Sequence, residues 1–158
     1  VTVGRELELV LTTENTGTHP FRYDDCLHTY FAVEEAGDCE IRGLEDCVYL
    51  DRVTDRSRIQ SGPLAFPPVL VNDTFIRSPG SAELHDRRSG RIFRVRQSGF
   101  GSSVVWNPGP EAGAKNDEVG AAWNRFVCLE SVNCMDARIQ LLPGTAHISR
   151  TVLSESRC

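Results

Sequence analysis

The chain has 158 residues, of which 40% are hydrophobic and 25% are charged, a composition typical of a globular protein that buries a core. Its net charge is −5, whereas nucleic-acid binding usually needs a concentrated basic face, so we expect no nucleic-acid partner. No stretch reaches the roughly 18 consecutive apolar residues of a membrane span, so we expect no membrane partner either.

The elements predicted along the chain are short strands separated by Gly, Pro, Asn and Asp, and helical spacing is hard to find. Residues 5–13 alternate leucine with glutamate and form the first strand. Residues 24–33, DDCLHTYFAV, form an apolar strand with His28 and Tyr30 on one face and Phe31 on the other. The one segment without a strand pattern is 111–124, a loop or short helix. The remaining single runs are CEIRGL, CVYLD, PVLVND, TFIRS, SSVVWNPGP and RFVCLESV. Two longer segments each read as two strands joined by a turn: AELHDRRSGRIFRVRQS, with the turn near Ser89-Gly90, and ARIQLLPGTAHISRTVL, with a Pro-Gly turn.

This series of strands predicts an all-β fold, either a sandwich or a large twisted double sheet. No internal repeat, low-complexity tract or linker divides the sequence, so we expect a single β-sandwich domain over residues 1–158. Within RFVCLESV, the period of two places Cys128 and Glu130 on one face of the strand and Leu129 on the other.

The chain contains six cysteines, at positions 26, 39, 47, 128, 134 and 158. A chain of this length can form its core without disulfide bridges, and no zinc-type C-x-x-C pair is present. We therefore expect reduced thiols and a cytoplasmic or other reducing intracellular compartment.

His28 and Glu130 stand out because each is a titratable side chain inside an apolar strand. Taken singly, each has a structural alternative: a hydrogen-bonded core histidine, or a glutamate on a solvated face. If they line one pocket, they form an acid and base pair whose unperturbed pKa values, about 6.5 and 4.3, burial can shift toward neutrality. Asp73, at the end of an apolar run, is a third candidate, with an Asx-type turn as its alternative.

Several motifs, in this order and spacing, resemble the C-terminal half of the hexose-6-phosphate 1-epimerases, which are mutarotases of the aldose 1-epimerase type. The resemblance covers nearly the whole chain and implies a galactose-mutarotase-like β-supersandwich. It implies a carbohydrate isomerase that interconverts the α and β anomers of a phosphorylated hexose such as glucose 6-phosphate. The motifs are LTTENTG, DDCLHTYFAV, IRGLEDCVYLDR, VNDTFIR, SSVVWNPG, NRFVCLESVN and LLPGTAHIS.

The same resemblance implies residue roles. His28, in LHTYF, and Glu130, in VCLE, match the catalytic pair; Asp73 matches the aspartate that binds sugar hydroxyls, and Tyr30 is expected to line the sugar cavity. The acid and base open the ring at C1, so the chemistry requires no cofactor and no metal. The expected ligand is a hexose or hexose 6-phosphate.

Three departures from the family pattern bear on these roles. Asp73 is followed by Thr74 and Phe75 where the family usually has Arg and Tyr, and Asn-Pro-Gly stands where members often have Asn-Pro-Trp. The family's N-terminal half, with the arginines thought to hold the phosphate, is not in the sequence. We therefore expect the domain to lack its N-terminal half, to have that half as a partner, and to show little or no activity alone.

Two other functions remain open at this point. A mutarotase of neutral aldoses would have the same fold and the same acid and base pair. A non-catalytic carbohydrate-binding β-sandwich would keep the pocket but has no need of that pair. In a third case, an uncharacterised β-domain, His28 and Glu130 would be structural.

Overall fold

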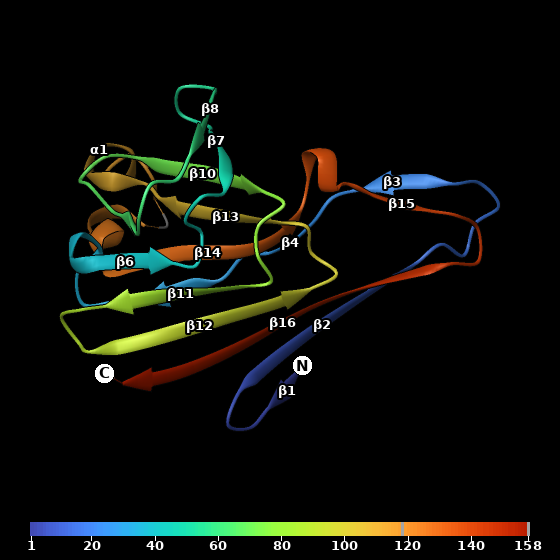
Figure 1. Cartoon of the computed structure of the whole chain (residues 1–158), viewed down its shortest axis with the longest axis horizontal. Helices are drawn as coiled ribbons and strands as arrows, with labels where there is room; N and C mark the ends of the chain where they lie inside the picture. The colour runs from blue at the N-terminus through green and yellow to red at the C-terminus, as the bar shows by residue number, and fades with distance from the viewer. Residues whose placement is uncertain (118, 158) are drawn as a thin grey trace.

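The computed structural model describes residues 1–117 and 119–157, and this part of the chain consists mainly of antiparallel strands (Figure 1). Two seven-stranded sheets pack face to face, and a two-stranded ribbon extends from one end. The first sheet has the order β1 (Thr2–Val3), β2 (Leu7–Glu14), β16 (Ala146–Arg157), β12 (Arg91–Ser98), β11 (Ser81–Asp86), β6 (Cys39–Arg42) and β9 (Leu64–Ala65).

The second sheet carries the sequence-predicted site residues. Its order is β4 (Asp25–Leu27), β14 (Phe126–Asn133), β13 (Ser102–Asn107), β10 (Val71–Ile76), β7 (Val48–Asp51) and β8 (Arg56–Ile59), and β5 (Tyr30–Ala32) also pairs with β14. The ribbon pairs β3 (Phe21–Tyr23) with β15 (Ile139–Leu141). The prediction of an all-β sandwich is confirmed.

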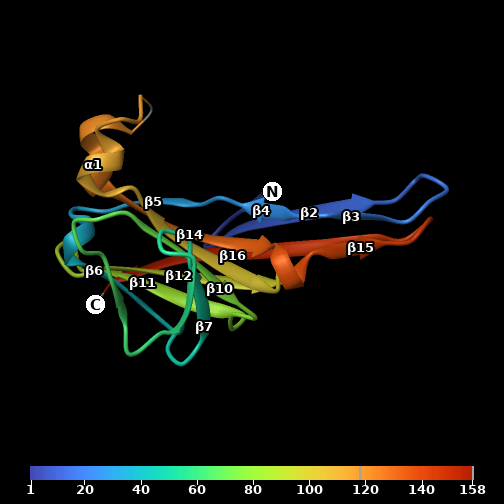
Figure 2. The ribbon, with the colours of Figure 1, turned by 90° about the horizontal axis from the view of Figure 1, so that it is seen from above.

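The helical elements are short. In the described part of the chain they are α1 (Gly109–Gly113) and three 3-10 turns: η1 (Ala36–Asp38), η2 (Gly120–Arg125) and η3 (Met135–Ala137). Figure 2 shows α1 standing off the end of the sandwich opposite the ribbon. The predicted non-strand segment 111–124 coincides with α1 and η2, although residue 118 lies outside the described residues. No helix in the described residues is long and apolar enough to cross a membrane.

The core fills the space between the two sheets. The central strands of the two sheets contribute alternate side chains to it, as a period of two requires. Phe75, Val105 and Leu129 point inward from the second sheet, and Ile41 and Leu84 point inward from the first. The alternate side chains of β10, β13 and β14 therefore form the opposite face of the second sheet, where the site lies.

Two strand predictions need correction. PVLVND and TFIRS are not separate strands, because β10 runs without interruption along β13 from Val71 to Ile76. Residues 24–33 form two strands, since the backbone pairing with β14 is interrupted at His28 and Thr29. The interruption does not shift the register, so the predicted common face of His28 and Tyr30 is confirmed.

The described cysteines, at positions 26, 39, 47, 128 and 134, are free thiols, as predicted. Cys158 lies outside the described residues. Cys39 and Cys128 are both fully buried. Cys39 belongs to the core, whereas Cys128 lies on the site face of the second sheet. Burial raises the pKa of Cys39 to about 12, so this thiol stays protonated at neutral pH.

Candidate active site

His28 and Glu130 lie together on the outer face of the second sheet. The Nε2 atom of His28 is 3.2 Å from Oε1 of Glu130. Leu27 pairs with Ser131 and Tyr30 with Cys128, so continuing the register across the interruption places His28 opposite Glu130. The structure thus brings together two residues that are about a hundred positions apart in the sequence.

The two partners differ in their access to solvent. The Glu130 side chain is 6% exposed, whereas that of His28 is 44% exposed. Glu130 is buried because β14 is an interior strand, with β4 and β5 on one side and β13 on the other. The pair therefore combines a buried carboxyl group with a solvent-accessible imidazole.

Both oxygens of Glu130 are held. Oε1 faces His28, and the thiol of Cys26 donates a hydrogen bond to Oε2 over 3.1 Å. Desolvation raises the pKa of Glu130, and the Cys26 hydrogen bond and the charge of a protonated His28 oppose this rise. The pKa of the Cys26 thiol is raised by desolvation and by the adjacent carboxylate, which keeps this thiol protonated as a donor.

Aromatic rings form one wall of the site. The ring of Tyr30 stacks on the imidazole of His28, with the centroids 4.6 Å apart and the planes 14° apart. Trp106 lies edge-on to both rings, at 6.2 Å from His28 and 6.3 Å from Tyr30. Phe126 contacts Tyr30 and Trp106 from the side. Because stacking restricts the imidazole, this wall orients the Nε2 atom toward Glu130.

Asp73 does not join this group. On β10 it pairs with Val105, which in turn pairs with Leu129, and these two side chains belong to the core face. Thr74 lies on the same face of the sheet as Glu130, because Thr74 pairs with Val104 and Val104 pairs with Glu130. Successive side chains of a strand point to opposite faces, so Asp73 faces away from the His28–Glu130 pair.

Asp73 has a different set of neighbours. It lies opposite Asp51 on β7, and Arg58 of β8 forms an ion pair with Asp51. Burial and the negative charge of Asp51 raise the pKa of Asp73 to about 6, against the opposing effect of Arg58. The resemblance assigns Asp73 to sugar binding, whereas the register of this chain places it on the face of the sheet opposite the His28–Glu130 pair.

Sequence reasoning missed three residues of the site: Cys26, Cys128 and Trp106. Strand phase alone places Cys26 on the face of His28 and Cys128 on the face of Glu130, but it gave neither cysteine a role in the site. Trp106 reaches the site by pairing with Cys128, which requires knowledge of the register. Among the described residues, His28, Cys128 and Glu130 are the group that could hold a metal, since one ligand atom from each lies within 4.8 Å of the others.

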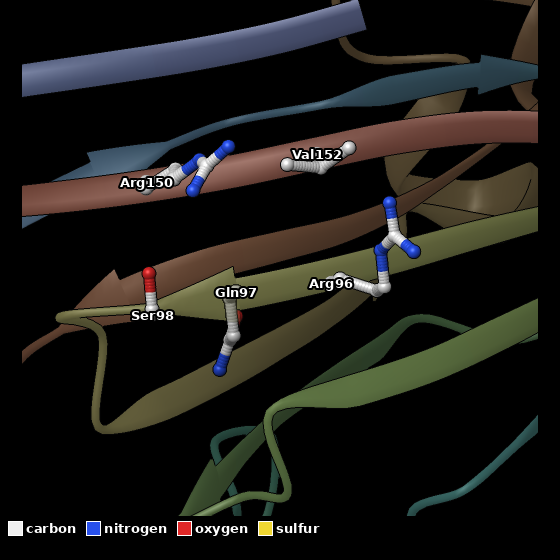
Figure 3. Close-up of a pocket in the computed structure, with 5 residues that line it drawn as sticks. All are labelled: Arg96, Gln97, Ser98, Arg150 and Val152. Atoms are coloured by element: carbon white, nitrogen blue, oxygen red, sulfur yellow. The ribbon is translucent and has the colours of Figure 1, made fainter. Parts of the chain in front are cut away.

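A separate hollow of about 230 Å³ lies on the outer face of the first sheet (Figure 3). Its charged lining residues are Arg96 and Arg150. Arg96 forms an ion pair with Glu6, and Arg150 forms an ion pair with Glu8. Val95 directly precedes Arg96 on β12 and lies in the core. Arg96 and the hollow therefore face away from the second sheet. Because its charges are neutralised within the sheet, it is a poor candidate for an anion site.

Comparison with known proteins places the chain in a family. The sequence profile described as aldose 1-epimerase matches residues 1–154. A protein of Cenchrus ciliaris named "Putative glucose-6-phosphate 1-epimerase" is 30% identical, over 98% of this chain and 48% of its own length. A protein of Salmonella typhimurium with the same name is 26% identical, over 82% of this chain and 43% of its own length.

The fold has a close counterpart among solved structures. A crystal structure described as a "putative mutarotase" from Salmonella typhimurium superposes with a TM-score of 0.89 and 22% identity, covering 99% of this chain and 52% of that one. The likeness confirms a mutarotase-like β-sandwich fold. The chain spans about half the length of the curated relatives it matches. From the profile match over residues 1–154, the chain belongs to the aldose 1-epimerase family.

Proposed function

We propose that the protein interconverts the α and β anomers of a hexose 6-phosphate such as glucose 6-phosphate. The observation that carries this proposal is the 3.2 Å approach of His28 Nε2 to Glu130 Oε1, with the imidazole accessible and the carboxyl group buried. An acid and a base this close together can act on two atoms bonded to one carbon. The names of the two curated relatives favour the phosphorylated sugar over the free one.

The reaction begins with Glu130 as the carboxylate and His28 as the imidazolium. Glu130 takes the proton of the C1 hydroxyl while His28 protonates the ring oxygen O5, and the bond between C1 and O5 breaks. Rotation about the bond between C1 and C2 turns the other face of the free aldehyde toward the O5 hydroxyl. When O5 attacks C1, His28 takes back its proton and Glu130 returns its own to the oxygen at C1. Both residues end in their starting states.

The surroundings of the pair suit these roles. The raised pKa of Glu130 makes its carboxylate a stronger base, and the Cys26 thiol holds the oxygen that does not face His28. Tyr30 and Trp106 would bind the apolar surface of the sugar ring beside the pair. We do not place Asp73 in the pocket, because it lies on the opposite face of the sheet.

The test is a mutarotation assay with three pure anomers: α-glucose 6-phosphate, α-glucose and α-galactose. We expect the full-length protein to equilibrate glucose 6-phosphate faster than either neutral sugar, as followed by polarimetry or NMR exchange. Faster turnover of a neutral aldose would replace the proposed substrate and keep the reaction. Binding of sugar without any acceleration of mutarotation would favour the non-catalytic carbohydrate-binding module.

A further inference from the structure

The site face carries a third metal-ligating side chain next to the acid and base pair. Cys128 precedes Glu130 by two positions on β14, so the two side chains lie on the same face. One nitrogen of His28, the sulfur of Cys128 and one oxygen of Glu130 all lie within 4.8 Å of one another. Within residues 1–117 and 119–157, no other three His, Cys, Asp or Glu side chains come this close.

These separations suit a tetrahedral zinc ion. Zinc bonds of about 2.0–2.1 Å to nitrogen or oxygen and about 2.3 Å to sulfur imply ligand separations of about 3.3 Å between N and O and about 3.5 Å between N and S. The His28 and Glu130 atoms are already 3.2 Å apart. The sulfur of Cys128 lies within 4.8 Å of the other two ligand atoms, so it needs to approach them by about 1.3 Å at most to complete three corners of the tetrahedron.

The chemistry of the ligands also fits zinc. Imidazole, thiolate and carboxylate form a mixed N, S and O set that zinc accepts and that magnesium and calcium do not favour. Among the described residues, Glu130 has His28 as its one ion-pair partner, so no lysine or arginine competes with a metal. Tyr30 and Cys26 hold the imidazole and the second carboxylate oxygen, as outer residues commonly do around metal ligands.

Access to this group is open on one side. The His28 side chain is 44% exposed, so an ion can arrive from solvent without unfolding the sheet. The other two ligands are buried, so a bound ion would interact with them in a medium of low dielectric constant. The exposed side leaves a fourth coordination position for water.

We propose that this cluster binds one Zn²⁺ through His28, Cys128 and Glu130, with water as the fourth ligand, and that the ion excludes the sugar. On binding, the Cys128 thiol loses its proton to solvent, and the charges of thiolate, carboxylate and Zn²⁺ cancel. The ion occupies the lone pairs through which His28 and Glu130 would transfer protons. Zinc is thus an inhibitor of the proposed reaction, and this half of the inference depends on the proposed function.

Zinc binding is tested with Co²⁺, which occupies zinc sites and absorbs visible light when it is bound there. We expect one equivalent of Co²⁺ to give the full-length protein a thiolate charge-transfer band and the intense visible bands of tetrahedral cobalt, both removed by one equivalent of Zn²⁺. Cys128→Ser should abolish the thiolate band and weaken Zn²⁺ binding at least 10-fold by calorimetry. Cys47→Ser is the matched control, because Cys47 packs against the core away from the site and should leave both signals unchanged.

The outcomes separate clearly. Absence of a thiolate band in the unsubstituted protein, or its persistence in Cys128→Ser, overturns the site. If Cys128→Ser does not fold, the second variant is His28→Asn, which replaces the ligand whose side chain is exposed. This variant should weaken Zn²⁺ binding at least 10-fold. An undiminished Zn²⁺ affinity in that variant also overturns the site.

The inhibition half needs an activity measurement. In chelator-treated protein we expect mutarotation of glucose 6-phosphate, its loss with one equivalent of Zn²⁺, and its recovery with excess chelator. Zinc that binds without slowing turnover refutes the exclusion of sugar. Absence of turnover in metal-free protein refutes the proposed function, while the cobalt spectrum still decides whether the metal site exists.

Discussion

His28 and Glu130 occupy opposite positions on neighbouring antiparallel segments, because β4 and β5 hold the same register on β14 on either side of His28. Directly opposite side chains of an antiparallel pair share one face and lie close together. The 3.2 Å contact therefore follows from backbone pairing and does not depend on a flexible loop. Stacking on Tyr30 then fixes the imidazole within that arrangement.

Removal of either partner should slow mutarotation without unfolding the protein. We expect His28→Asn and Glu130→Gln each to lower kcat by about 10²- to 10⁴-fold, the usual contribution of a general acid or base. The control is His85→Asn, which disrupts a histidine and glutamate pair of similar length, 3.0 Å, on the first sheet. Circular dichroism checks the fold, and an unfolded His28→Asn variant would instead assign His28 a structural role.

The rate should follow a bell-shaped pH profile. Glu130 must be ionised, and its pKa is raised by burial, so the acidic limb should lie above the usual range of a glutamate. The alkaline limb is expected because ring opening needs a proton donor to O5. A flat profile between about pH 5 and 9 would contradict the acid and base roles.

Cys26 should act as a positioning residue for Glu130. Its thiol stabilises the carboxylate, so Cys26→Ala should raise the pKa of Glu130 further and move the acidic limb of the rate profile to higher pH. Cys26→Ser keeps a donor and should restore the limb. An acidic limb that stays in place in Cys26→Ala would show that the thiol does not influence the base.

Asp73 should reduce stability when it is ionised. Its pKa is about 6 in the folded protein and near the ordinary value of 3.8 when unfolded, so the folded state binds more protons between these values. The free energy of unfolding therefore falls as pH rises from about 4 to 6, and the penalty persists above that range. Discounted for partial exposure, Asp73→Asn should stabilise the protein by about 1–2 kcal/mol at about pH 7.5.

The control for this prediction is its neighbour Asp51, whose pKa is lowered by hydrogen bonds from Thr54 and Val53. Ionised Asp51 stabilises the fold above its unfolded pKa, so Asp51→Asn should destabilise at the same pH. Urea denaturation at about pH 4 and 7.5 measures both variants. Equal effects of Asp73→Asn at the two pH values would exclude the linkage.

Asn107 should be important for stability at the end of β13. Its amide nitrogen donates to the carbonyls of Trp123 and Phe126, at 2.8 Å each, and its Oδ1 accepts from the amide of Gly109 at 2.9 Å. Asn107→Ala leaves these buried groups unpaired, so we expect a loss of about 2–4 kcal/mol in urea denaturation. Asn124→Ala removes one partly buried hydrogen bond, to Glu35, and should lose about 1 kcal/mol or less.

The fold class could be predicted because several strands have clear alternation or clear turn residues at their ends. The leucines of β2 and the apolar run of β14 are examples. The two-residue strand β9 and the exposed strand β8 have no such pattern and were missed. Short strands of this kind owe their conformation to a neighbouring strand, which local sequence does not specify.

The site could be predicted only in part, for a related reason. Strand phase indicates that His28 and Tyr30 share a face, but it does not say which strand lies opposite. The resemblance to a family predicted that His28 and Glu130 act together. The periodicity of the strands did not predict that they meet. The placement of Asp73 depends on the register of β10 on β13, and a shift of one residue would reverse its face.

Glu130 and Asp73 lie on opposite faces of one sheet, yet both have raised pKa values because both are buried. Ionisation of either carboxyl group therefore works against folding, while ionisation of Glu130 is what the proposed chemistry requires. These two groups therefore shift the pH of greatest stability toward acid, away from the pH at which the proposed reaction is fastest. Stability would be a misleading guide for choosing assay conditions, and a screen for a higher melting temperature would select proteins with a weakened base.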